Sequence, residues 1–145
     1  TVQFHEDHMS TKSKIKAGEL NPFGELIGLK FNKCEAGYSQ CTLEINQSMM
    51  NPFGKLHGGV MYSMIDTGMG IALLNCLSDN EHCATIEIQI SYFSPVTSGT
   101  LICESRLICR KGSIGFMEAK VKDNENLIAS ASGTFSIIDN KKDQS

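Results

Sequence analysis

One carboxylate, Asp66, lies in the middle of the most apolar segment of this 145-residue chain. It is the only charged side chain between Leu56 and Ser78. An ionised carboxylate inside a protein is costly unless a partner offsets the loss of water, and the segment contains no Lys or Arg that could pair with it. Asp66 is therefore either a structural acceptor for nearby hydroxyl or backbone donors, or a catalytic carboxylate.

The sequence His57-Gly58-Gly59 stands where this apolar segment begins. The segment is too long for one strand and predicts a helix from near Gly58 to near Asn75, apolar almost all round and buried on most sides. The first N–H groups of a helix lack intrahelical partners and lie at the positive end of its dipole. Since glycine lets a ligand approach closely, the helix start could hold an anion or a developing oxyanion. The alternative is tight packing of the helix end against a strand.

The separation of Gly58 and Asp66 sets a condition on any chemistry that uses both. Eight residues of helix rise about 12 Å. The attacking atom and the oxyanion donors, however, must lie within about 3–3.5 Å of one reacting carbon. One helix cannot bring both groups to that carbon, whereas two antiparallel copies can. A catalytic Asp66 therefore predicts a twofold dimer with two shared sites.

The segments before and after the predicted helix have patterns typical of strands, and these strands must hold the helix in position. Two strands are expected around a turn at Ala36-Gly37 within residues 25–46, and four more over residues 83–93, 100–110, 113–123 and 127–138. The first of these four alternates apolar and polar residues from Ala84 to Tyr92. Consecutive strands joined by short turns are antiparallel. About six strands curled around one helix give an α+β fold and account for a helix that is apolar on nearly all sides.

The length of the chain fits one domain with a sizeable core. A short helix is predicted within residues 9–20, and Asn-Pro-Phe-Gly at 21–24 and again at 51–54 predicts turns. The predicted organisation is an N-terminal extension with a short helix, one folded domain and a frayed tail, over residues 1–20, 21–138 and 139–145.

Composition argues against several classes of protein. A formal net charge of −3 gives no support to a nucleic-acid-binding surface. The apolar segment does not predict a membrane span, because a charge such as Asp66 at the bilayer centre costs about 2.5–3.5 kcal/mol. No secretory signal is visible, so a cytoplasmic location is expected, with an organelle matrix left open. The six cysteines show no Cys-x-x-Cys pair or zinc spacing, and reduced core thiols are favoured over a disulfide between Cys34 and Cys41.

The stretch NPFGKLHGGVMYSMIDTGMGIALLN at residues 51–75 resembles the signature of the hotdog-fold acyl-CoA thioesterases, of the phenylacetate-degradation type within the 4-hydroxybenzoyl-CoA thioesterase superfamily. That signature has an Asn, then Gly-x-x-His-Gly-Gly, then a helical Asp eight residues after the first Gly of the pair. The matching residues are Asn51, Gly54, His57, Gly58, Gly59 and Asp66. ATIEIQISYFSP at 84–95 also resembles the family's third strand, and the resemblance extends over about residues 20–138.

The resemblance implies a six-stranded antiparallel sheet wrapped around the central helix, in a homodimer that is often doubled to a tetramer. It implies hydrolysis of an acyl thioester, usually of coenzyme A, with no metal and no separate cofactor. The Gly58 N–H would polarise the thioester carbonyl with help from Asn51, and Asp66 of the partner subunit would act as general base or as nucleophile. His57 would shape the loop and hold either Asn51 or the sulfur side of the thioester. Thr85 stands where relatives have a hydroxyl that helps to orient water.

The phosphates of coenzyme A have a candidate site in the basic turn Arg110-Lys111-Gly112-Ser113, which offers charge and backbone donors. Gly59, at the helix start, is a further candidate for contact with the coenzyme A part of the substrate. An ordinary solvated hairpin is the alternative interpretation of the turn.

Other interpretations stay open at this point. An acyl dehydratase or hydratase on the same fold is disfavoured, because the chain lacks the Asp-x-Asn-Pro-x-His and His-x-x-Gly-x-Pro patterns. A hotdog protein that binds acyl-CoA without catalysis, or a structural oligomer in which Asp66 is only an acceptor, is also possible. The acyl group is not specified. Four side chains of the predicted helix could line an apolar tunnel for it: Met61, Met64, Met69 and Ile71. Met at helical spacing, however, more often fills the core.

Overall fold

The computed structural model describes residues 21–143. In chain order the elements are α3 (Pro22–Ile27), β1 (Lys30–Glu35), β2 (Tyr38–Glu44), the 3-10 turn η1 (Gln47–Met49), α4 (Gly58–Leu74), β3 (Glu81–Tyr92), β4 (Thr100–Lys111), β5 (Ile114–Asp123), β6 (Asn126–Asp139) and α5 (Asn140–Asp143). The helix predicted within residues 9–20 lies outside the described residues.

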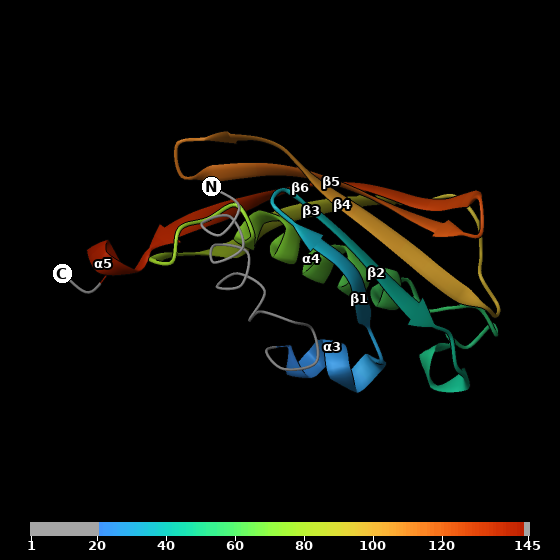
Figure 1. Ribbon diagram of the computed structural model, residues 1–145. Coiled ribbons are helices and arrows are strands. Elements are labelled where there is room, and N and C mark those ends of the chain that lie inside the picture. The colour runs from blue at the N-terminus through green and yellow to red at the C-terminus, as the bar shows by residue number, and fades with distance from the viewer. Residues whose placement is uncertain (1–20, 144–145) are drawn as a thin grey trace.

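The six strands form one antiparallel sheet with the order β1-β2-β4-β5-β6-β3. Figure 1 shows this sheet curving around α4, which runs along its concave face. Strands β1 and β3 are the two edges of the sheet. The predicted α+β fold, with a six-stranded antiparallel sheet around one long helix, is confirmed.

Helix α4 begins and ends where the sequence predicts, since it spans Gly58–Leu74 and Asn75 caps its C-terminus. Its sheet-facing side carries Met64, Ile65, Met69 and Leu73, all completely buried. Burying a side chain of this size stabilises a fold by about 1.5–3 kcal/mol. These residues, with the inner faces of the strands, make up the core, so methionines proposed as tunnel lining serve mainly as core filler.

The opposite side of α4 remains partly open to solvent in the single chain. We call this side the open stripe, and its half-buried or exposed members are Gly59, Tyr62, Ser63, Asp66, Thr67, Gly70 and Leu74. The prediction that α4 is buried on most sides therefore holds only for its sheet-facing half. The reason is that one curved sheet covers one side of a helix, and another surface is needed to cover the rest.

The two Asn-Pro-Phe-Gly copies fold differently. The first copy opens α3: Asn21 is its N-cap and accepts a hydrogen bond from the Gly24 N–H at 3.1 Å. The turn predicted at residues 21–24 and the strand predicted to begin near residue 25 are therefore wrong. A helix forms instead, because Pro fits the first helical position and Asn is a favoured cap. At the second copy the Gly54 N–H donates to the Asn51 carbonyl at 3.1 Å, which confirms the predicted turn.

Strand β3 contains an irregularity that its sequence does not predict. Its register against β6 shifts between Thr85 and Glu87, so Ile86 forms a β-bulge. Ile86 is 55% exposed, whereas Cys83 and Ile88 are half-buried. The expectation of one unbroken alternation from Ala84 to Tyr92 is therefore wrong, since an extra residue exchanges the two faces of the strand.

None of the six cysteines, all of which lie within the described residues, forms a disulfide bond. Cys34 lies opposite Ser39 in the β1–β2 register, while Cys41 lies opposite Phe31 and, on its other side, Cys103. The disfavoured Cys34–Cys41 disulfide is therefore not formed.

At the C-terminal end of the domain, where the sequence predicts a frayed tail, β6 ends at Asp139 and the helical turn α5 follows it.

Candidate active site

The first turn of α4 leaves one backbone donor open. His57 is the N-cap, and its Nδ1 atom accepts a hydrogen bond from the Gly59 N–H at 2.8 Å. Within residues 21–143 no acceptor binds the Gly58 N–H. Gly58 is thus the group that can polarise a ligand at the positive end of the helix dipole. Gly59, predicted to contact coenzyme A, has its N–H committed to His57.

A cavity of about 340 Å³ lies directly at this helix start. The described residues that line it are Asn51, Lys55, Leu56, Gly58, Met61, Tyr92, Phe93, Ser94 and Pro95. Most of these side chains are apolar or aromatic, and a few polar groups converge on them, as is common in sites for small molecules. The structure thereby brings together two predicted site residues, Asn51 and Gly58.

The two polar atoms of the Asn51 side chain differ in their hydrogen bonding. Its Oδ1 atom accepts hydrogen bonds from the N–H groups of Phe53 at 2.9 Å and Lys55 at 3.1 Å, which fixes the turn before α4. Its Nδ2 group donates no hydrogen bond within the described part of the chain and remains available to a ligand. Between His57 and Asn51, as the structure has them, there is no hydrogen bond, so the predicted contact between these two side chains is not formed.

Asp66 is half-buried and is oriented by one hydroxyl group. The Oγ1 atom of Thr85 donates to Asp66 Oδ1 at 2.6 Å. Thr85 precedes the Ile86 bulge on the helix side of β3, which explains how a residue in an apparently polar position reaches α4. No Lys or Arg among residues 21–143 pairs with Asp66, and its second carboxylate oxygen is left for another partner.

Cys83 is a neighbour of Asp66 that the sequence did not single out. Its Sγ atom contacts the Gly70 carbonyl oxygen of α4 at 3.8 Å. Burial raises the pKa of this thiol to about 11, and the negative charge of Asp66 adds to the rise. The thiol therefore stays protonated at neutral pH and is an uncharged neighbour of the carboxylate.

The candidate site is divided into two halves on one chain. Gly58 and Asn51 belong to the cavity at the start of α4, whereas Asp66 is not among its lining residues and is bound instead by Thr85. This division agrees with the separation of about 12 Å expected for eight residues of helix. Neither half alone contains both an oxyanion donor and a carboxylate.

Tyr92 is a site residue that sequence reasoning missed. It is the last residue of β3, and its hydroxyl donates to the Gly58 carbonyl oxygen at 2.8 Å. Burial, and to a lesser extent the neighbouring Tyr62, raises the pKa of Tyr92 above its ordinary value, so the phenol remains a donor at neutral pH. Its position directly before Phe93 at the end of a strand was the only sequence signal, and it is a weak one.

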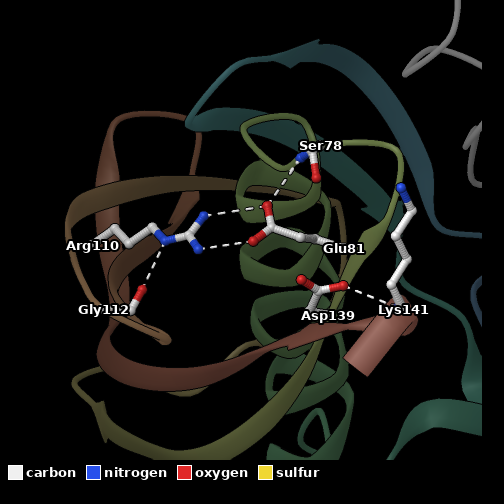
Figure 2. A network of polar contacts seen from close by, with 6 residues as sticks. All are labelled: Ser78, Glu81, Arg110, Gly112, Asp139 and Lys141. Atoms are coloured by element: carbon white, nitrogen blue, oxygen red, sulfur yellow. Dashed lines mark hydrogen bonds and ion pairs between the residues drawn. The ribbon is translucent and has the colours of Figure 1, made fainter. Parts of the chain in front are cut away.

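The turn proposed for coenzyme A phosphates lies at the other end of α4, where its arginine is already paired (Figure 2). Arg110 Nη2 lies 2.8 Å from Glu81 Oε2, and Arg110 Nε donates to the Gly112 carbonyl at 2.9 Å. The Arg110 guanidinium lowers the pKa of Glu81 to about 2, helped by the Ser78 N–H. A cavity of about 700 Å³ adjoins this pair and includes Gly112 and Ser113 in its lining. Lys111 is exposed beside it.

Residues 21–143 contain no group of three His, Cys, Asp or Glu side chains placed to hold a metal ion. In the same residues, no helix is both long and apolar enough to cross a membrane.

Comparison with known proteins identifies the family. The family described as the Thioesterase superfamily matches residues 53–130. This chain belongs to the thioesterase superfamily. It is 32% identical over 110 residues to a protein of Saccharolobus solfataricus provisionally named an esterase, which covers 75% of this chain and 73% of the relative.

A further relative of this thioesterase agrees with the assignment in sequence, and a solved structure agrees with it in fold. A 1,4-dihydroxy-2-naphthoyl-CoA hydrolase of Listeria monocytogenes is 24% identical over 119 residues, covering 81% of this chain and 97% of the relative. The crystal structure of a thioesterase from Haemophilus influenzae superposes with a TM-score of 0.78 at 24% identity, over 83% of this chain and 85% of that one. The thioesterase has the hotdog fold and is a thioester hydrolase.

Proposed function

We propose that this thioesterase hydrolyses acyl-CoA thioesters at two sites, each shared between the subunits of a homodimer. One observation carries the proposal. Gly58 and Asn51 both line a cavity, and within residues 21–143 the Gly58 N–H has no acceptor and the Asn51 amide group donates no hydrogen bond. The only carboxylate of α4, Asp66, is not among the residues that line this cavity. A second copy of α4 running antiparallel would complete each half with the missing group.

In the proposed reaction, the thioester carbonyl lies between the two halves of the site, one from each subunit. Asp66 of the partner subunit removes a proton from water, which attacks the carbonyl carbon; alternatively, the carboxylate attacks directly and water then hydrolyses the acyl-enzyme anhydride. The carbonyl oxygen becomes an oxyanion that the Gly58 N–H and Asn51 Nδ2 stabilise. When it collapses, the carbon–sulfur bond breaks and coenzyme A leaves as a thiolate that takes up a proton. Thr85 holds one oxygen of Asp66 so that the other faces the reaction.

The open stripe of α4 supports the proposed dimer. Tyr62, which is exposed on this stripe, lies halfway along the sequence between Gly58 and Asp66. If two stripes pack antiparallel with Tyr62 near the twofold axis, Gly58 of each chain lies beside Asp66 of the other. The adjacent strand β3 is a sheet edge, whose unpaired backbone groups favour association with another strand. A further doubling to a tetramer is proposed from the family resemblance alone.

The coenzyme A phosphates are proposed to bind near Lys111 and the backbone of Gly112 and Ser113. Arg110 is a weaker candidate than the sequence indicated, because Glu81 already occupies its guanidinium group. The acyl group is proposed to lie against Met61 and Phe93 in the cavity at the start of α4. These side chains suit an apolar acyl group, aliphatic or aromatic.

A panel of acyl-CoA substrates with detection of free thiol tests the activity and its acyl preference. Subunit sharing is tested by mixing two impaired variants, Asp66→Asn and Asn51→Asp, after dissociation and reassociation, and by comparing the mixture with each variant alone. Random pairing makes half of the dimers mixed, with one intact site each, so about one quarter of wild-type activity should return. Recovery of no activity, or an active monomer at the assay concentration, would contradict the shared site.

A further inference from the structure

Strand β3 binds α4 at the two points that carry the proposed chemistry. Thr85 donates to the Asp66 carboxylate at 2.6 Å, and Tyr92 donates to the Gly58 carbonyl at 2.8 Å. Seven residues separate Thr85 from Tyr92, so in a regular strand their side chains would point to opposite faces. The bulge at Ile86 adds one residue and turns both side chains toward the helix. The bulge is thus what allows one strand to contact both groups.

Tyr92 also packs directly against the first turn of α4. A Cβ atom added to Gly58 would lie 3.3 Å from both the Cζ and the hydroxyl oxygen of Tyr92. The backbone of Tyr92 is fixed in the sheet opposite Ala129, which is completely buried, and the Phe93 N–H donates to the Ile128 carbonyl at 2.8 Å. A ring held on a rigid strand therefore touches Gly58, whose N–H has no acceptor within residues 21–143.

We propose that Tyr92 is a positioning residue for this thioesterase: its ring and hydroxyl hold the first turn of α4 so that the Gly58 N–H points at the developing oxyanion. The inference rests on the proposed role of Gly58. An oxyanion donor acts over about 2.7–3.1 Å. A misplacement of about 1 Å can cost on the order of 10²-fold in rate. A contact that fixes the backbone of the first turn should therefore affect turnover more than substrate binding.

The test compares Tyr92→Phe and Tyr92→Leu with Tyr38→Phe as the matched control. Tyr38 also loses a hydroxyl that makes one hydrogen bond, to Glu104 at 3.0 Å, but it lies away from the cavity. We expect kcat to fall about threefold to tenfold in Tyr92→Phe, the scale of one lost hydrogen bond. In Tyr92→Leu, which also loses the ring, kcat should fall about a hundredfold. KM and the affinity for a non-hydrolysable thioether analogue should stay within about twofold, and Tyr38→Phe should keep its kcat.

Coupling to Gly58 gives a second readout that a purely structural function would not change. Gly58→Ala pushes against Tyr92, so its loss of kcat should be markedly smaller in the Tyr92→Leu background than in the wild type. Additive losses would overturn the proposal. So would an unchanged kcat in both Tyr92 variants, a change in KM alone, or a decrease in kcat matched by Tyr38→Phe.

The control variant Asp66→Asn separates this proposal from the proposed function. If the wild type is active, Asp66→Asn is inactive and both Tyr92 variants turn over normally, only the Tyr92 proposal fails. If Asp66→Asn retains full activity, the proposed function fails and the Tyr92 proposal fails with it.

Discussion

The two ends of α4 differ in how completely their backbone groups are paired. At the C-terminal end the last four carbonyl groups all accept hydrogen bonds: Ile71 from Asn75, Ala72 from the Gly37 N–H, Leu73 from Cys76 and Leu74 from Leu77. The Glu81–Arg110 ion pair then fixes the following loop through Ser78. At the N-terminal end, by contrast, the Gly58 N–H has no acceptor among the described residues, and Gly58 lines a cavity.

We infer from this difference that stabilisation and the proposed chemistry are located at opposite ends of a single helix. Buried backbone groups are nearly always paired because an orphaned one costs free energy. An unpaired donor is tolerated where a ligand or water can reach it, and it is useful only there. We therefore expect substitutions near Gly58 and Asp66 to change turnover at little cost in stability, and substitutions around Glu81 to do the reverse.

The largest effect is expected for Asp66→Asn. The amide keeps the shape of the side chain but removes the base and the negative charge, so kcat should fall at least about a hundredfold. The melting temperature should hold or rise, because a half-buried charge without a cationic partner opposes folding. Both quantities are measured on the same purified protein, with Asp79→Asn, on an exposed loop, as the control. A near-normal kcat with a sharply lowered melting temperature would show that Asp66 is only a structural acceptor.

Asn51→Asp should cause the second largest loss of turnover. The carboxylate keeps an acceptor for the Phe53 and Lys55 N–H groups but loses the amide donor, so kcat should fall about tenfold to a thousandfold with the turn intact. Asn51→Ala loses the acceptor as well and should therefore also lower the melting temperature. Hydrolysis rates and melting temperatures of the pair separate the two functions of this side chain. Equal turnover in Asn51→Asp and the wild type would remove Nδ2 from the site.

Thr85→Val should have a smaller effect on turnover. It removes the hydroxyl that orients Asp66 but leaves the carboxylate in place, so kcat should fall about tenfold. Thr85→Ser retains the hydroxyl and should stay near the wild-type rate, which makes it the matched control. If the serine variant loses as much activity as the valine variant, packing rather than the hydrogen bond is responsible.

Glu81→Gln should have the smallest effect and should not change kcat. The Arg110 side chain is 40% exposed, so solvent screens the pair and the loss in melting temperature should be about 1–3 °C. Pairing lowers the pKa of Glu81 to about 2, below its ordinary 4.5, so its stabilisation is complete above pH 4.5 and is lost as the pH falls toward 2. In thermal melts of both proteins, the difference in melting temperature should therefore become smaller as the pH falls from 7 to 3. A tenfold loss of kcat would instead link this end of α4 to the reaction.

Local patterns in the sequence were sufficient for most of the architecture. A long apolar run between His57 and Asn75 could only be one helix, and its observed bounds agree with that prediction. The four strands after it follow from short apolar segments between turn residues. The spacing of Gly58 and Asp66 predicted that the two must come from different copies of the chain if both act in one reaction, because the rise of a helix is fixed at about 1.5 Å per residue. The role of Asn51 was predicted from the family resemblance alone.

Tertiary structure decided which side chains meet. The β3 sequence alternates without interruption, so nothing local distinguishes a regular strand from one bulged at Ile86; only its register against β6 places Thr85 and Tyr92 on the same face. Arg110 looked free for phosphate because its partner, Glu81, is 29 residues away in the chain. Hydrogen bonds and ion pairs between distant segments depend on how the strands are ordered in space, and local propensity carries no information about that order.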